Sequence, residues 1–150
     1  MSVKDRLTED MKLAMKEREA GKFRLSVIRM VRSSIKNVEI DRQKELSEDE
    51  VLDVLAKEVK LRRDAAEEFK KGNRPDLVTA LEQEVSILLQ YLPEQLSEAE
   101  VRALVAEAVA ATGASDVKAM GKVMAVLMPK VKGRADGKLV NTVVKELLSQ

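Results

Sequence analysis

The residues best suited to chemistry in this chain are the cations of its last third. Between residues 118 and 145 there are seven basic residues and one acid, a local balance of +6 in a chain whose net charge is only +1. Clustered cations bind polyanions because they displace the counterions that condense on phosphates. The segregation therefore predicts a phosphate-contacting surface, and the alternative interpretation is the solvated surface of an ordinary small domain.

A glycine-containing loop of sequence KVKGRADGK lies within this basic segment. Gly133 and Gly137 free the backbone, and the helix expected after the loop would present its N-terminal amides beside Arg134 and Lys138. Such a loop is suited to cradle a phosphate. It is not a Walker A loop, because its glycines are too close together and no Ser or Thr follows Lys138 to hold magnesium. A second interpretation, compatible with the first, is a helix–helix connection capped by Asp136.

These two features define the predicted nucleic-acid-binding set. It comprises Lys118, Lys122, Lys130, Lys132, Gly133, Arg134, Gly137 and Lys138. The chain has only two Phe, one Tyr and no Trp, so stacking on unpaired bases is not available on a useful scale. Recognition would have to rest on backbone and shape, which suits a folded RNA better than a single strand.

Composition argues against most catalytic classes. The chain contains no His and no Cys, which removes the usual neutral-pH base, thiolate chemistry, disulfides and the commonest transition-metal ligands. Acidic clusters such as Glu48, Asp49 and Glu50 lack the apolar neighbours that raise a carboxyl pKa for acid catalysis, and we assign them to helix capping. We therefore expect no catalytic residue, no metal, no cofactor and no small-molecule substrate.

The N-terminal sequence MSVKDRLTED lacks the apolar region of a signal peptide. No stretch approaches the roughly 18 apolar residues that a membrane span needs. We therefore expect no membrane association and a cytoplasmic location.

Hydrophobic periodicity predicts an all-α protein. Apolar residues recur every three or four positions in four segments, which predicts helices over about 3–19, 22–43, 48–72 and 75–92. Short turns separate them, so we expect a four-helix up-and-down bundle over residues 1–93.

Particular residues mark the ends and faces of these helices. Gly21 suits a C-cap, and Ser47 with Glu50 forms a capping box. Phe23 and Phe69 fall on the apolar faces of the second and third helices, whereas Arg62 interrupts the apolar face of the third.

Pro93 stops the fourth helix, and a second capping box then opens a new unit. We predict a three-helix subdomain over residues 94–150, with helices that begin near Ser97, Ser115 and Asp136. Pro129 should end or kink the middle one.

Two further patterns have a structural and a functional interpretation. Met120, Met124 and Met128 follow helical spacing, which favours core packing over an adaptable binding surface. Four cations lie along one stripe of the second helix, namely Lys22, Arg29, Arg32 and Lys36. We expect this stripe to be a solvated face paired with acids of the third helix.

Three segments of the sequence resemble one known family. They are LSVIRMVRSSIKN at 25–37, LLQYLPEQLSEAEV at 88–101 and MGKVMAVLMPKVKGRADGKLVNTVVKELL at 120–148. They are similar to the YqeY family, and the resemblance covers essentially the whole chain. The family pattern falls on residues 121–124 and 132–137 without departure.

The resemblance implies two all-helical subdomains and kinship with the tail domain of the B subunit of the tRNA-dependent amidotransferase. The resemblance also implies kinship with a domain appended to some glutaminyl-tRNA synthetases. In both settings the domain assists tRNA binding. The amidotransferase reaction itself, a carbon–nitrogen ligation with glutamine as amide donor, needs domains that this chain lacks.

We therefore predict a non-catalytic accessory protein that contacts the tRNA backbone through its C-terminal unit. The alternative is an adaptor that docks on a synthetase, an amidotransferase or another copy of itself. An enzyme that acts alone on a carbon–nitrogen bond is the least favoured interpretation.

Overall fold

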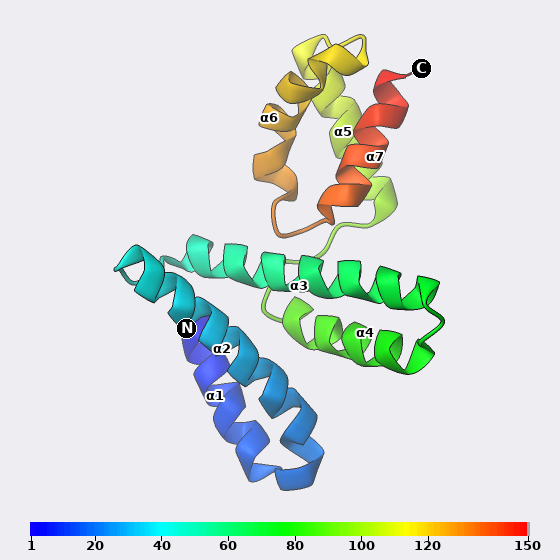
Figure 1. Cartoon of the computed structure of the whole chain (residues 1–150). Helices are drawn as coiled ribbons and strands as arrows, with labels where there is room; N and C mark the ends of the chain where they lie inside the picture. Colours follow the sequence, from blue (N-terminus) through cyan, green and yellow to red (C-terminus); the bar gives the residue numbers. More distant parts are fainter. Residues whose placement is uncertain (150) are drawn as a thin grey trace. The chain divides into compact units, whose positions relative to one another are not determined.

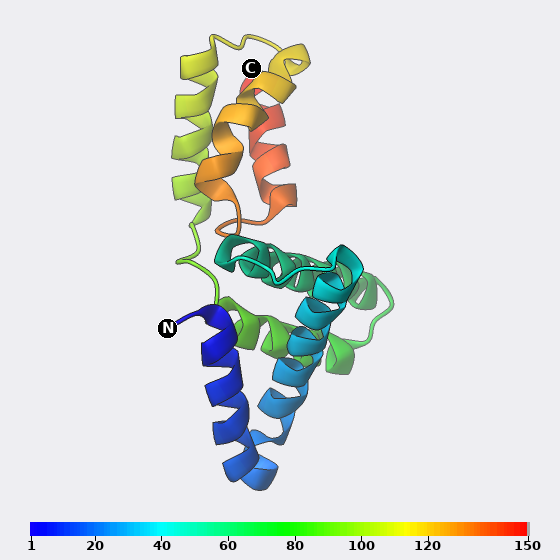
Figure 2. The same ribbon diagram turned by 90° about the vertical axis from the view of Figure 1, so that its left-hand side faces the viewer.

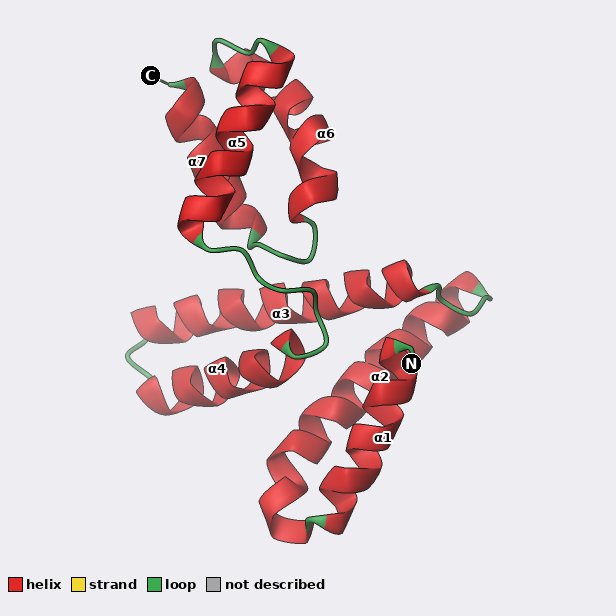
Figure 3. Ribbon diagram, turned by 180° about the vertical axis from the view of Figure 1, so that it is seen from behind, coloured by secondary structure: helices red, strands yellow, loops and turns green. Residues whose placement is uncertain are grey.

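The computed structural model describes residues 1–149, which form helices joined by short turns (Figures 1 and 3). The α-helices are α1 Val3–Lys16, α2 Lys22–Arg42, α3 Glu48–Lys71, α4 Pro75–Leu89, α5 Glu98–Thr112, α6 Met120–Val131 and α7 Gly137–Leu148, with short 3-10 segments η1 Arg18–Gly21 and η2 Val117–Ala119. No strand occurs within residues 1–149. The predicted all-α class is confirmed.

The chain divides into two compact units, one of residues Met1–Leu92 and one that begins at Pro93. Unit 1 contains α1 to α4 around buried residues such as Leu7, Ile28 and Leu88. Unit 2 contains α5 to α7 around a separate apolar cluster that includes Leu127 and Val143. Each unit therefore has a hydrophobic core of its own, in which its helices bury their apolar faces against one another.

Unit 1 consists of two antiparallel helix pairs, α1 with α2 and α3 with α4 (Figures 1 and 2). The first pair runs at an angle to the second in both views. The predicted up-and-down arrangement, in which all four helices run alongside one another, is therefore not confirmed. The division into separate domains of residues 1–93 and 94–150 stays a prediction.

The turn between α1 and α2 uses its glycine differently from the prediction. Helix α1 is capped by Glu17, and Arg18 takes the left-handed conformation with φ 53°. Gly21 is buried, and a Cβ atom built on it would lie 2.2 Å from the carbonyl oxygen of Ala14. Gly21 is therefore needed for close approach of the two backbones rather than as a C-cap.

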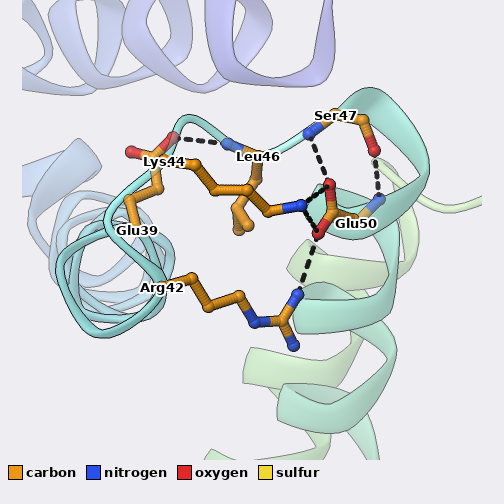
Figure 4. Close-up of polar contacts among 6 residues, drawn as sticks. All are labelled: Glu39, Arg42, Lys44, Leu46, Ser47 and Glu50. Atoms are coloured by element: carbon orange, nitrogen blue, oxygen red, sulfur yellow. Dashed lines mark hydrogen bonds and ion pairs between the residues drawn. The ribbon is translucent and has the colours of Figure 1, made fainter.

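The connection between α2 and α3 is held by two carboxylates (Figure 4). Glu39 accepts a hydrogen bond from the backbone N–H of Leu46 at 2.9 Å. Glu50 forms ion pairs with Arg42 at 2.9 Å and Lys44 at 3.0 Å. The hydrogen bond from Lys44 is the largest of several that lower the pKa of Glu50 from 4.5 to about 2. This corner is thus fixed by charge as well as by the buried side chain of Leu46.

Both predicted capping boxes are present. The Ser47 hydroxyl accepts from Glu50 N while the Glu50 carboxylate accepts from Ser47 N, and Ser97 with Glu100 repeats the arrangement at α5. A third box, in which Ser2 precedes α1 and Asp5 takes the acidic position, was not predicted. The three boxes satisfy amides that a helix leaves without partners at its N-terminus.

Arg62 is the charged residue that interrupts the apolar face of α3, and it is buried. Its Nη1 lies 2.6 Å from a carboxylate oxygen of Glu58, one turn earlier. Its Nε lies 3.7 Å from Glu84 on α4. The interruption is therefore an ion-paired link between α3 and α4, because a buried cation must be compensated by nearby anions.

Three aromatic or methionine side chains assigned to the core are only partly covered. Phe23 is 41% exposed, Phe69 36% and Met128 42%. Phe23 and Phe69 lie in the first and last turns of their helices, where the packing of a helix pair ends. Pro129 does not end α6, which continues to Val131, and the Lys132 N–H bonds the Met128 carbonyl at 2.9 Å.

Candidate nucleic-acid interface

The predicted set of basic residues is distributed over both ends of unit 2. Lys118 lies in η2 and Lys122 in the first turn of α6. Lys130 lies in the last turn of α6, and Lys138 is the second residue of α7. Lys130 lies eight positions after Lys122 on the helix, which corresponds to about 12 Å along the axis. The structure therefore does not bring Lys118 and Lys122 together with the residues of the α6–α7 connection.

The cations that do gather are Lys130, Lys132, Arg134 and Lys138, which we call the connection cluster. The three lysines are exposed and Arg134 is half-buried. They stand within nine consecutive residues that reverse the chain between α6 and α7, the turn visible at the end of these helices in Figure 2. Four cations around one turn form a compact, solvent-facing positive surface.

Arg134 is held by contacts with the segment that precedes α5. Its Nε donates to the carbonyl of Glu94 at 3.2 Å, and its own carbonyl accepts from the Leu96 N–H at 2.8 Å. The Gln95 side-chain amide donates to the carbonyl of Gly133 at 2.8 Å. Gly133 has φ 71°, which a residue with a Cβ atom rarely adopts. The loop is therefore fixed, and the glycine has a structural reason.

The N-terminus of α7 is capped from within the chain. The carboxylate of Asp136 accepts from the Lys138 N–H at 3.0 Å. A carboxylate in this place occupies the positive end of the helix and would repel a phosphate from the same amides. The capped helix–helix connection is thus observed, while a phosphate cradle made of α7 amides has no support. Any anion would be bound by the basic side chains.

One acidic residue, Glu100, interacts with the connection cluster through the charge of Arg134. The pKa of Glu100 is lowered mainly by the hydrogen bond from the backbone of Ser97, and in smaller part by the charge of Arg134. The charge of the Arg134 guanidinium therefore also stabilises the ionised form of Glu100 on α5 of the same unit. Within the described residues there is no group of three or more acidic side chains placed to hold a metal.

A second basic surface, which the sequence did not identify as a site, lies between α1 and α2. Arg29, Arg32 and Lys36 line a groove of about 640 Å³ together with Lys4 of α1. The predicted pairing of this stripe with acids of α3 is wrong for these three, since they face α1. The available signal was the absence of any acidic residue from Lys22 to Val38.

No helix within residues 1–149 is both long enough and apolar enough to cross a membrane.

Comparison with known proteins places the chain in context. A family model described as Yqey-like protein matches residues 4–148. A protein of Lachancea thermotolerans named Altered inheritance of mitochondria protein 41, mitochondrial, is 42% identical over 102 residues, which cover 66% of this chain and 54% of that protein. Proteins of the same name from Kluyveromyces lactis and Pyrenophora tritici-repentis are 42% identical over 86 residues (57% of this chain, 45% of that protein) and 29% identical over 147 residues (95% and 79%).

Two properties of these relatives matter for the interpretation. The chain spans about half the length of the first two, which therefore contain regions that this chain does not match. All three carry the word mitochondrial in their names. This finding contradicts the cytoplasmic location expected from the sequence, which rested only on the lack of a recognisable targeting or membrane segment.

Proposed function

Because the chain belongs to the family of Yqey-like proteins, as the resemblance indicated, we propose that it is a non-catalytic accessory protein that binds the backbone of tRNA. The connection cluster of unit 2 makes the contact. The tRNA partner follows from the kinship of the family with the tail domain of the tRNA-dependent amidotransferase.

The observation that carries this proposal is the exposure of three lysines around one fixed turn. Lys130, Lys132 and Lys138 face solvent, and the loop between them is held in place through Arg134 and Gly133. A positive surface on a rigid support loses little conformational entropy on binding. It has no aromatic side chain to read bases, so it would recognise the phosphate backbone and its shape.

The non-catalytic part of the proposal rests on the composition. A chain without His or Cys lacks the usual acid–base and thiol groups. We therefore assign no amide transfer to this chain alone, despite the kinship with an amidotransferase. Because its relatives are named as mitochondrial proteins, the tRNA partner is not restricted to a cytoplasmic one.

A second candidate function, protein docking, is favoured by one specific observation in the same unit. Helix α6 exposes Val126 at 38% and Met128 at 42%. Two positions apart on a helix, these side chains do not share a face, so each would contact a partner such as a synthetase or an amidotransferase separately. This function predicts binding that tolerates salt and does not respond to RNA.

The test is a titration of fluorescent bulk tRNA with the whole chain over a salt series. The first variant combines Lys130→Gln, Lys132→Gln and Lys138→Gln, and it keeps Arg134 because that residue holds the loop. The matched control combines Lys118→Gln, Lys122→Gln and Lys145→Gln, which removes the same charge from unit 2 outside the connection cluster. Circular dichroism checks that both remain folded.

We expect log affinity to fall with log salt, and the slope to drop by roughly 0.7 to 0.9 for each phosphate contact that the first variant loses. The control should keep most of the affinity. If both variants bind as the parent does, or if unstructured RNA displaces tRNA equally well, the proposal is wrong and protein partners become the better candidates.

A further inference from the structure

A basic groove of about 640 Å³ lies between α1 and α2 in unit 1. Four cations line it: Lys4 from α1, and Arg29, Arg32 and Lys36 from α2. The three on α2 are spaced three and four residues apart, so they share one face of the helix. Seven residues from Arg29 to Lys36 correspond to a row of about 10 Å.

The two arginines lack the carboxylate partners that exposed arginines commonly have. Among residues 1–149, the structure records no hydrogen bond or ion pair for the Arg29 guanidinium, and the Arg32 guanidinium contacts the thioether sulfur of Met11 at 2.8 Å. A thioether is only a weak acceptor and carries no charge. Glu39 is the acid that lines the groove, and it is engaged by Lys4 and by the backbone of Leu46. The groove therefore keeps an excess of positive charge.

The walls of the groove combine apolar and polar surface in similar proportions. Leu7 and Ile35 line it but are 1% and 4% exposed, so their surface is already buried in the core of unit 1. The remaining uncharged lining comes from Met11 and from two hydroxyl residues, Thr8 and Ser33. Among the residues that the structure describes, no aromatic side chain lines the groove for a base to stack on, and four cations stand among its apolar surface. The lining instead matches phosphate groups, which guanidinium, ammonium and hydroxyl groups bind through their oxygens.

The groove is held open at a defined width from both ends. At the turn, the backbones of α1 and α2 approach closely through Gly21 and Ala14. At the opposite end, Lys4 of α1 pairs with Glu39 of α2. The cations in between lie on α2, whose separation from α1 is fixed at both ends, and this reduces the ordering that a ligand would have to impose.

We propose that this groove binds successive phosphates of an RNA backbone, with Arg29 and Arg32 as the principal contacts. Successive phosphates of one strand lie further apart in space than the axial rise of about 3.4 Å in duplex DNA, because the strand winds round the axis, so a row of about 10 Å is long enough for two. The site lies in unit 1 and shares no residue with the connection cluster. The inference rests on the proposed function only in taking RNA as the source of the phosphates.

The test compares two variants of the whole chain for binding of bulk tRNA. The groove variant is Arg29→Gln with Arg32→Gln, which retains side-chain length and helix propensity. The matched control is Lys12→Gln with Lys16→Gln, two exposed cations of α1 that do not line the groove. We expect about tenfold weaker binding for the groove variant at 0.1 M salt and a salt slope smaller by roughly 1.4 to 1.8, corresponding to two lost contacts. The control should stay within about twofold of the parent.

A direct reading of the site uses the parent protein and does not depend on the variants. The Nε–Hε signals of Arg29 and Arg32 are followed by nitrogen-15 NMR, first with tRNA and then with inorganic tripolyphosphate. Movement of both signals with tRNA at concentrations where tripolyphosphate has no effect supports an RNA backbone site. Movement with tripolyphosphate alone, or with neither, overturns the inference.

The two proposals fail in different ways. If the Lys130, Lys132 and Lys138 variant loses tRNA while the groove variant does not, the proposed function stands and this inference is wrong. If the groove variant alone loses tRNA and its arginine signals respond, the groove binds RNA and the connection cluster does not.

Discussion

The two helix pairs of unit 1 differ in how particular arginines are used. In the pair α3–α4, basic residues are joined to acids, from the buried Arg62 with Glu58 and Glu84 to the exposed Arg74 with Asp76. In the pair α1–α2, Arg29 and Arg32 line an open groove and have no carboxylate partner among the described residues. Charges of the same kind thus stabilise one pair and remain available in the other.

The difference shows that a net charge near zero does not indicate which individual cations are available to bind a ligand. Unit 1 contains cations throughout, and in α3 Arg62 and Lys70 form ion pairs with acids on the same helix or on α4. On α2, seventeen residues from Lys22 to Val38 include no acid at all. Whether a basic residue is available to a ligand therefore depends on the acidic residues that its own helix and the neighbouring helix place beside it.

The largest expected effect concerns the buried ion pairs of Arg62 between α3 and α4. Arg62→Met should lower the free energy of unfolding by about 2–4 kcal/mol, because it leaves Glu58 and Glu84 partly buried without their cation. Urea denaturation measures the change. The control Arg74→Gln, which breaks an exposed pair with Asp76, should cost no more than about 0.5 kcal/mol. Equal effects would mean that burial of the Arg62 pair has no special weight.

The next effect tests what holds α1 against α2. Gly21→Ala should lower the free energy of unfolding by about 1–3 kcal/mol, because its Cβ would overlap the backbone of Ala14 and force the helices apart. Gly121→Ala is the control, since no atom lies within 4 Å of a Cβ at that position. It should be neutral or stabilise by up to about 1 kcal/mol through helix propensity. A tolerated Gly21→Ala would show that the groove width is adjustable.

A smaller effect concerns the corner that joins the two pairs, and it depends on pH. The folded pKa of Glu50 is about 2, below its ordinary 4.5, so its ionised form stabilises the fold above pH 4.5 and this contribution is lost as pH falls toward 2. Glu50→Gln should therefore lower the urea midpoint at pH 7 and approach the parent near pH 2. Asp49→Asn, on the same helical turn, controls for the helix dipole. A difference that is constant from pH 7 to pH 2 would contradict the assigned pairing.

The smallest expected effect concerns the two arginines of α2 that line the groove. Arg29→Gln with Arg32→Gln should leave the free energy of unfolding within about 0.5 kcal/mol of the parent, or raise it slightly, because like charges three residues apart repel. The same urea measurement applies. A loss above about 1 kcal/mol would show that these arginines are structural, and the groove would lose its interpretation as a binding surface.

Much of the local structure could be predicted from the sequence. The periodicity indicated each of the seven α-helices within residues 1–149, although α6 begins at Met120 rather than near Ser115. Two capping boxes and the Asp136 cap were predicted from residue type and spacing. These features depend on neighbours within four residues, which the sequence displays directly.

What could not be predicted depends on partners that are distant in the sequence. Arg62 was an unexplained interruption until Glu84 was brought beside it from α4. Phe23 fits an apolar stripe, but only the arrangement of the helix pairs shows that its turn is poorly covered. The basic residues of the candidate sites could be named, whereas the separation of Lys118 from Lys130 and the facing of Arg29 toward α1 required the fold.

The contacts between the α6–α7 loop and residues 94–96 also determine how this region opens. The Leu96 amide is bonded to the Arg134 carbonyl, so its hydrogen exchange with solvent requires a local opening that also releases the loop. The exchange rate of that single amide therefore reports whether the loop is in its observed position. A ligand that rigidifies the loop would slow this exchange even though it never touches Leu96.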